Sequence, residues 1–203
     1  MLTPQRLRHG RTGDSGPIAR RSTWSDGADE LSGFFATIKS SDLCSIARHW
    51  DAARGSKRMP AWRDIDPSAI APFLPIVWSW KYDNVTDTFI GRLGGDAITE
   101  AFGESMRGKP MKEFFRGRIY DMMFARHKRV VTTPAFAHGA GPVFIHAGRY
   151  GQGERIIMPL ASDGIHGDGI FGATIYAPNP ARRPDETAHQ NIAAEAVDFF
   201  PLD

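Results

Sequence analysis

A glycine-rich stretch, FIGRLGGDAITEAFGESMRGKP at residues 89–110, is the first candidate for chemistry, because glycine loops can bind phosphate. A phosphate-binding loop has the pattern G-x-x-x-x-G-K-[ST], in which the final hydroxyl holds Mg²⁺. Gly103, Gly108 and Lys109 have this spacing, but Pro110 follows and supplies neither a hydroxyl nor a backbone N–H. The stretch therefore predicts a tight corner between a strand and a helix rather than a phosphate site.

Arg92 is a second candidate, because it is a charged residue in an apolar strand-like run between Ile90 and Leu93. An ionised guanidinium in such a place needs a partner, since burying an unpaired charge is costly. One role is to clamp an anionic ligand inside a cavity. The role that we favour is structural, with Arg92 fixing a short helix to the sheet through a carboxylate. The candidate carboxylates are Asp64, Asp66 and Glu113.

The histidines do not predict a metal centre, because none belongs to an HExxH motif or to another closely spaced ligand pair. A single axial haem ligand has no recognisable spacing. We therefore interpret them as core or surface residues and identify no metal site and no cofactor. The histidines considered are His127, His138, His146 and His166.

Nucleophilic catalysis has no motif in this chain. There is no G-x-S-x-G elbow, and the sequence at 162–164, SDG, has the composition of a turn. We therefore expect that the protein is not an enzyme. The alternative is a small enzyme in which Arg92 grips a carboxylate and His146 or Asp163 moves a proton.

The composition is that of one soluble domain with tails. The chain has 203 residues, of which 41% are hydrophobic and 24% charged, enough for one well-filled core. Cys44 is the only cysteine, which excludes an intrachain disulfide and favours the cytoplasm. No run approaches the ~18 apolar residues that a membrane span needs, and no secretory signal is apparent.

Residues 1–23 form a basic arm with few apolar side chains, too few to offset the entropy of ordering it. Such an arm can bind nucleic acid through phosphate contacts, and this is an alternative function. Solvated basic leaders are commoner, so we expect nucleic acid not to be the partner.

Residues 24–56 predict a helical extension with an apolar stripe. The spacing i, i+3, i+4 and i+7 recurs within SDLCSIARHW at 41–50 and similarly within ADELSGFFATI at 28–38. Such stripes can be buried in a homodimer. The candidate dimer residues are Phe34, Phe35, Leu43, Ile46 and Trp50.

The remaining chain predicts strands at both ends of a domain with helices between them. A hairpin ends at Gly94-Gly95, with Asp96 as the cap of the next helix, and three strands fill the region up to Pro178. Residues 186–200 predict a final amphipathic helix. The fold class is thus α+β, a five-stranded antiparallel sheet with helices on one face and an N-terminal helical extension. The boundaries are 57–178 for the domain and 179–203 for a C-terminal helix and tail.

This order of elements resembles the PAS fold. RMPAWRDIDPSAIAPFLPIVW at 58–78 is similar to the bacterial single-domain PAS proteins grouped as PAS_5, with DIDP, a short helix and LP ahead of the first strand. Residues 89–111, MPLASDG at 158–164, and Trp50 with the glycine after it also resemble that family. The resemblance covers about Trp50 to Ala177.

The resemblance implies a stand-alone sensory or regulatory module, often dimeric, that binds a small molecule, a signalling partner protein or both. It implies no common ligand or reaction. In a PAS domain the ligand would lie between the sheet and the helices, where flexible and aromatic side chains are expected. The pocket candidates are Arg92, Met106, Met111, Phe115, Tyr120, Met123, His146 and Met158.

Overall fold

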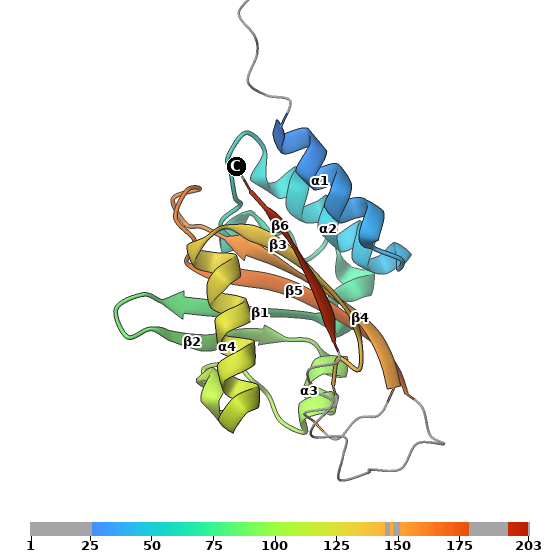
Figure 1. Cartoon of the computed structure of the whole chain (residues 1–203), viewed down its shortest axis with the longest axis vertical. Coiled ribbons are helices and arrows are strands. Elements are labelled where there is room, and N and C mark those ends of the chain that lie inside the picture. The colour runs from blue at the N-terminus through green and yellow to red at the C-terminus, as the bar shows by residue number, and fades with distance from the viewer. Residues whose placement is uncertain (1–25, 145–146, 148–150, 179–194, 203) are drawn as a thin grey trace, which may run out of the picture.

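The computed structural model describes residues 26–144, 147, 151–178 and 195–202 (Figure 1). The predicted arm at 1–23 lies outside these residues. In chain order the elements are α1 (Asp26–Thr37), α2 (Ser41–Arg54), η1 (Trp62–Asp64), η2 (Ala71–Ile76), β1 (Val77–Asp83), β2 (Thr88–Gly94), α3 (Asp96–Phe102), η3 (Met111–Glu113), α4 (Gly117–Thr132), β3 (Ala135–Gly141), β4 (Gly151–Leu160), β5 (Gly169–Pro178) and β6 (Ala196–Pro201), where η marks a 3-10 helix.

The strands of the described chain form one six-stranded antiparallel sheet in the order β2-β1-β5-β4-β3-β6. The hairpin β1–β2 joins the later strands through β5, so both ends of the domain contribute to the same sheet. The helices between β2 and β3 pack on this sheet, and α4 crosses in front of the strands in Figure 1. The predicted α+β class with a PAS-like antiparallel sheet is confirmed.

Alternation along the strands divides the interior into two cores, because successive side chains point to opposite faces. On β1, Val77 belongs to one core, whereas Trp78 and Trp80 belong to the other. On β5, Phe171 and Ile170 are divided in the same way. We call the first the extension core, since α1 and α2 cover it, and the second the cavity core, since α3, η3 and α4 cover it. Helices therefore cover both faces of the sheet.

Helix α2 is fixed to β4 at both ends. The carboxylate of Glu154 accepts the backbone N–H groups of Lys39 and Ser40 at 2.7 and 2.9 Å, ahead of the first turn. Near the other end, the indole of Trp50 donates to the Pro159 carbonyl at 2.8 Å. The second of these contacts satisfies an indole N–H that is fully buried, and together they join the helical extension to the sheet of the domain.

The predicted dimer residues lie mostly inside this chain. Phe34, Leu43, Ile46 and Trp50 are fully buried in the extension core, and Phe35 is half-buried. A side chain that is already covered by its own sheet has no surface to share with a second copy in this conformation. The stripe was read correctly as apolar, but the structure uses it within one chain.

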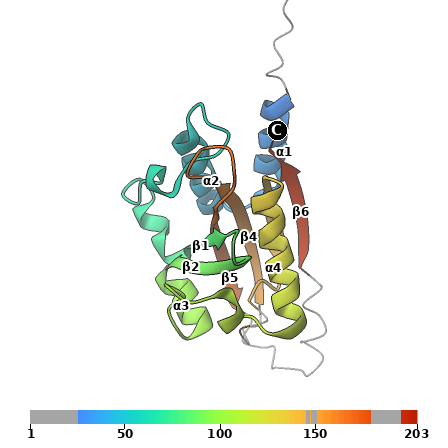
Figure 2. The ribbon, with the colours of Figure 1, turned by 90° about the vertical axis from the view of Figure 1, so that its left-hand side faces the viewer.

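The predicted C-terminal helix over 186–200 is wrong for its described part, because residues 196–201 form the edge strand β6. This strand pairs with β3 from Ala135↔Pro201 to Ala140↔Ala196. Figure 2 shows β6 beside α4, with α1 above it. The alanine-rich run favours a helix locally, but β3 would otherwise expose an unpaired edge, and tertiary pairing overrides propensity. The sheet has six strands instead of five for this reason.

The corner after β2 needs a glycine because another part of the backbone lies very close to it. Gly95 has an ordinary negative φ, but a Cβ there would collide with the carbonyl oxygens of Leu74 and Pro75. Gly95 is the residue ahead of α3, and no side chain caps this end. The predicted cap Asp96 is instead the first residue of the helix, where its charge favours the positive end of the helix dipole.

Removing the Trp50 side chain tests whether the extension belongs to the domain. Trp50→Ala deletes a fully buried ring and its hydrogen bond to the Pro159 carbonyl, so the free energy of unfolding is expected to fall by about 3–5 kcal/mol. Urea denaturation measures this change. The matched control on the exposed side of α2, Ser45→Ala, is expected to change it by less than about 0.5 kcal/mol. Equal effects of the two substitutions would contradict an integral α2.

Candidate ligand-binding site

A small cavity of about 20 Å³ lies between the sheet and the helices α3 and α4. This space holds about one water molecule and is well below the roughly 300–1,000 Å³ of small-molecule sites. A larger ligand therefore requires side chains of the cavity wall to move. The lining of the cavity is Trp78, Trp80, Ile98, Phe102, Met106, Phe115, Met123, His127, Phe144, Arg155 and Thr174.

The floor of the cavity is the inner face of β1 and β5. The indole N–H of Trp78 donates to the Thr174 hydroxyl at 2.9 Å, which fixes the ring across two strands. The ring lies over Gly172, where an added Cβ would collide with it. A glycine in the central strand thus makes room for the tryptophan.

The roof of the cavity contains aromatic and methionine side chains. Phe102 of α3 makes edge contacts with the rings of Phe115 and Phe144, at centroid distances of 5.7 and 6.0 Å. Met106 and Met123 complete the apolar wall. Methionine side chains change rotamer easily, so this wall can adapt to a ligand.

His127 of α4 is a neutral polar group in the cavity wall. Its Nδ1–H donates to the Met123 carbonyl at 2.6 Å, and its ring lies against Trp78 and Phe89. Burial lowers the pKa of His127 to about 3, and the nearby Arg126 and Arg155 act in the same direction. Because Nδ1 carries the proton, Nε2 has a lone pair and is an acceptor at neutral pH.

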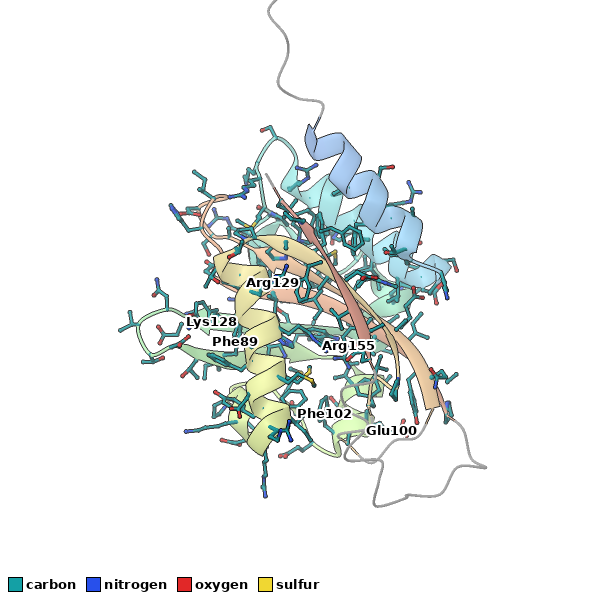
Figure 3. All side chains as sticks on the ribbon, in the orientation of Figure 1. Phe89, Glu100, Phe102, Lys128, Arg129 and Arg155 are labelled. Carbon is teal, nitrogen blue, oxygen red and sulfur yellow. The ribbon has the colours of Figure 1, made fainter. Side chains whose placement is uncertain are left out.

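Arg155 of β4 supplies the positive charge of the cavity. It is 3% exposed, and it lies beside α4 in Figure 3, with Phe102 nearer α3. Its Nη1 lies 3.7 Å from Glu195, which bonds Arg126 of α4 at 2.6 Å. Burial lowers the pKa of Arg155, and Glu195 opposes that shift. Burial alone would raise the pKa of Glu195, but the attraction of Arg155 and Arg126 outweighs it, so this pKa lies below its ordinary value.

An open groove adjoins the cavity, and the two share Phe144 and Thr174. The groove is lined mainly by apolar side chains of α3 and β5, among them Ala101, Ile175 and Tyr176. The edge of the Phe144 ring contacts Tyr176 at a centroid distance of 5.7 Å. Phe144 therefore lies between the inner cavity and solvent.

Three of the predicted pocket residues line the cavity: Met106, Phe115 and Met123. Met111 and Tyr120 belong to the cavity core or pack against it, but they do not line the cavity. Met158 lies on the opposite face, in the extension core. The prediction for His146 lies outside the described residues.

Arg92 is also away from the cavity. Its guanidinium lies over the ring of Trp62 in η1, 5.0 Å from the centroid, and burial lowers its pKa while Asp168 opposes the shift. The predicted carboxylates are not its partners, since Asp64 bonds Lys57 and Asp66 bonds Ser68. The favoured structural role fits this position, with an aromatic ring in place of a carboxylate.

The sequence analysis missed Arg155, the charged residue of the cavity lining. Arg155 stands in the run ERIIMPL and gives the same signal as Arg92, a cation in an apolar strand. Period-two alternation places it on the face of Ile157, which belongs to the cavity core. Trp78 and Trp80 were equally accessible to this reasoning, because they alternate with Val77.

Two groups of the alternative enzyme, Arg92 and Asp163, do not line the cavity, and the third, His146, lies outside the described residues. Asp163 accepts hydrogen bonds from Ile165 and His166 in an exposed turn, and Arg92 lies against η1. Within the described parts of the chain, no three His, Cys, Asp or Glu side chains gather to hold a metal ion. Every helix in the described residues is too short or too polar to cross a bilayer.

Residues 38–175 match the model of the family PAS_5, a PAS domain. Neither curated proteins nor solved structures give a significant match to this chain. The matched range begins just before α2 and ends within β5, so it contains the cavity lining.

The neutral state of His127 predicts a specific loss of stability in acid. Its pKa is about 3 in the folded protein and near 6.5 in the unfolded chain, so between these values only the unfolded chain binds the proton. The contribution of the neutral His127 to the free energy of unfolding is complete above pH 6.5 and is lost as the pH falls toward 3. His127→Asn keeps an N–H donor for the Met123 carbonyl and removes the titration.

Urea denaturation at pH 7 and at pH 4.5 measures this contribution in both proteins. The wild type is expected to lose more free energy of unfolding over this interval than His127→Asn does. Equal losses would contradict a buried neutral His127, because the carboxylates that also titrate there are common to both proteins.

Proposed function

Because the chain belongs to the PAS_5 family of PAS domains, we propose that it is a sensory or regulatory module that binds a small molecule in the cavity beneath α3 and α4 and acts on a partner protein. The observation that carries this proposal is the cavity itself. It combines a mostly aromatic wall with three polar groups, Thr174, His127 and Arg155. Small-molecule sites have this combination of an apolar body and a few fixed polar groups.

The position of the cavity supports a signalling role. Its walls come from α3, α4 and the strands β1, β4 and β5, which are far apart in the sequence. A ligand in the cavity contacts all of these elements, so its binding can favour one packing of the helices against the sheet over another. A ligand shifts such an equilibrium by its difference in affinity for the two states. The flexible Met106 and Met123 are where the packing can change at least cost.

A homodimer in the cytoplasm remains part of the proposal. The resemblance to PAS proteins supports the dimer, but Phe34, Leu43, Ile46 and Trp50 are covered within one chain, so other surfaces must form it. Light scattering at high protein concentration distinguishes a dimer from a monomer. Basic residues of the arm are the basis of the nucleic-acid alternative, which no described residue supports.

Filling the cavity tests the proposed site. Single-ring aromatic acids, amides and alcohols are screened by thermal shift, with product detection in the same samples. We expect saturable stabilisation without turnover, and its loss in Ile98→Trp, since the larger ring occupies the space of a ligand. Val85→Trp is the control, because Val85 is 89% exposed.

Stabilisation that survives in Ile98→Trp would place the ligand elsewhere. Conversion of a screened compound that depends on the same cavity would favour the enzyme alternative over the sensor.

A further inference from the structure

Arg155 has unused hydrogen-bonding capacity at the wall of the cavity. Its Nη2 donates to the Val143 carbonyl, and its Nη1 lies 3.9 Å from the Met123 sulfur, a weak acceptor. Its Nε has no hydrogen-bond partner although it is buried, and Glu195 Oε1 of the same cluster is also buried without one. Buried guanidinium groups normally have partners for their N–H donors. The unpartnered donor of Arg155 is therefore a place where an acceptor on a ligand can bind.

The charges around Arg155 are unequal. Arg126 and Glu195 are both more than nine-tenths buried and bond each other directly at 2.6 Å. Arg155 is 3.7 Å from the same carboxylate, beyond hydrogen-bonding distance. Among the described residues, Glu195 is the carboxylate whose charge acts on Arg155, and it is shared with Arg126. Within the described parts of the chain, two buried cations therefore face one anion, and the net charge of this cluster is +1.

The sheet makes room for the Glu195 carboxylate above Gly139. In the sheet, Gly139 of β3 lies between Arg155 of β4 and Val197 of β6. A Cβ at Gly139 would collide with the Glu195 carboxylate, so that carboxylate occupies the space above the glycine. The oxygen above Gly139 is Oε1, whereas Oε2 bonds Arg126, so Glu195 neutralises Arg126 directly and acts on Arg155 only from 3.7 Å.

We propose that Arg155 is the carboxylate anchor of this cavity and that the ligand is a small aromatic monocarboxylate, a proposal that rests on the sensor function above. Because the cavity holds about one water molecule, the ring of the ligand enters among Trp78, Trp80 and Phe115 by displacing the flexible side chains of Met106 and Met123. Its carboxylate accepts the Nε–H of Arg155. With the ligand carboxylate bound, the two cations Arg126 and Arg155 are matched by two anions, Glu195 and the ligand. Glu195 limits the ligand to a single negative charge, because a second one would have no cation.

Matched acid and amide pairs test the anchor. The probes are benzoate, phenylacetate and their primary amides, and the readout is the dissociation constant by calorimetry at fixed pH and salt. The wild type is expected to bind each acid at least about tenfold more tightly than its amide, as a charge-assisted hydrogen bond requires. Arg155→Met is expected to abolish this preference and to leave amide binding within about threefold.

Three further variants make the test independent of the folding of Arg155→Met. Arg155→Lys keeps the charge but not the planar donors, and it is expected to weaken acid binding about tenfold. Glu195→Gln removes the competing anion and is expected to strengthen acid binding. Arg92→Met removes a half-buried arginine on the other face and is expected to leave the preference unchanged.

Equal binding of acid and amide by the wild type would overturn the anchor while leaving the sensor proposal intact. A full preference in Arg155→Lys, or weaker acid binding in Glu195→Gln, would overturn it as well. Failure of every acid and amide to bind would overturn both this inference and the cavity as a site for such ligands.

Discussion

The buried guanidinium of Arg155 is the constraint around which one face of the sheet is arranged. It is carried by a central strand, at the edge of an aromatic cavity and away from bulk water. A charge in this position is tolerated only with compensation. Part of that compensation comes from Glu195, which directly precedes β6 and whose carboxylate lies above Gly139 and 3.7 Å from the guanidinium. The cavity, the glycine and the last strand are therefore linked by one electrostatic requirement.

The opposite face of the sheet is arranged mainly by apolar packing, with the hydrogen bonds of Glu154 and Trp50 at its margins. Phe34 and Trp50 lie against Phe136 of β3, with ring centroids 4.6 and 4.8 Å away. This packing makes α1 and α2 a second layer of the domain, so a sheet that would otherwise have one wet face is covered on both. Phe200 of β6 also reaches Phe34, at 5.7 Å. Strand β6 is thus held from one side by α1 and from the other by α4, where Arg129 lies over Phe199.

Sequence patterns predicted the elements far better than their partners. The period-two runs around Trp78 and Phe171 and the helical period around Trp50 are local signals, so the antiparallel sheet and α2 could be predicted. What covers an apolar stripe is a long-range property, which is why Phe34 and Leu43 were assigned to a dimer. The helix predicted for the C-terminal segment failed for the same reason, since only the unpaired edge of β3 makes a strand favourable there. In the site, Met106, Phe115 and Met123 could be predicted because flexible and aromatic side chains are typical of a ligand pocket. Whether a strand arginine lines the cavity depends on the face of the sheet that carries it, and this places Arg155, not Arg92, at the cavity.

A crystal structure of the protein with bound benzoate tests the central claim most directly. The account predicts that the carboxylate lies within hydrogen-bonding distance of Arg155 Nε, that the ring lies among Trp78, Trp80 and Phe115, and that Glu195 keeps its bond to Arg126. Benzoate bound outside the cavity, or a Glu195 carboxylate that itself occupies the free donor of Arg155, would contradict it.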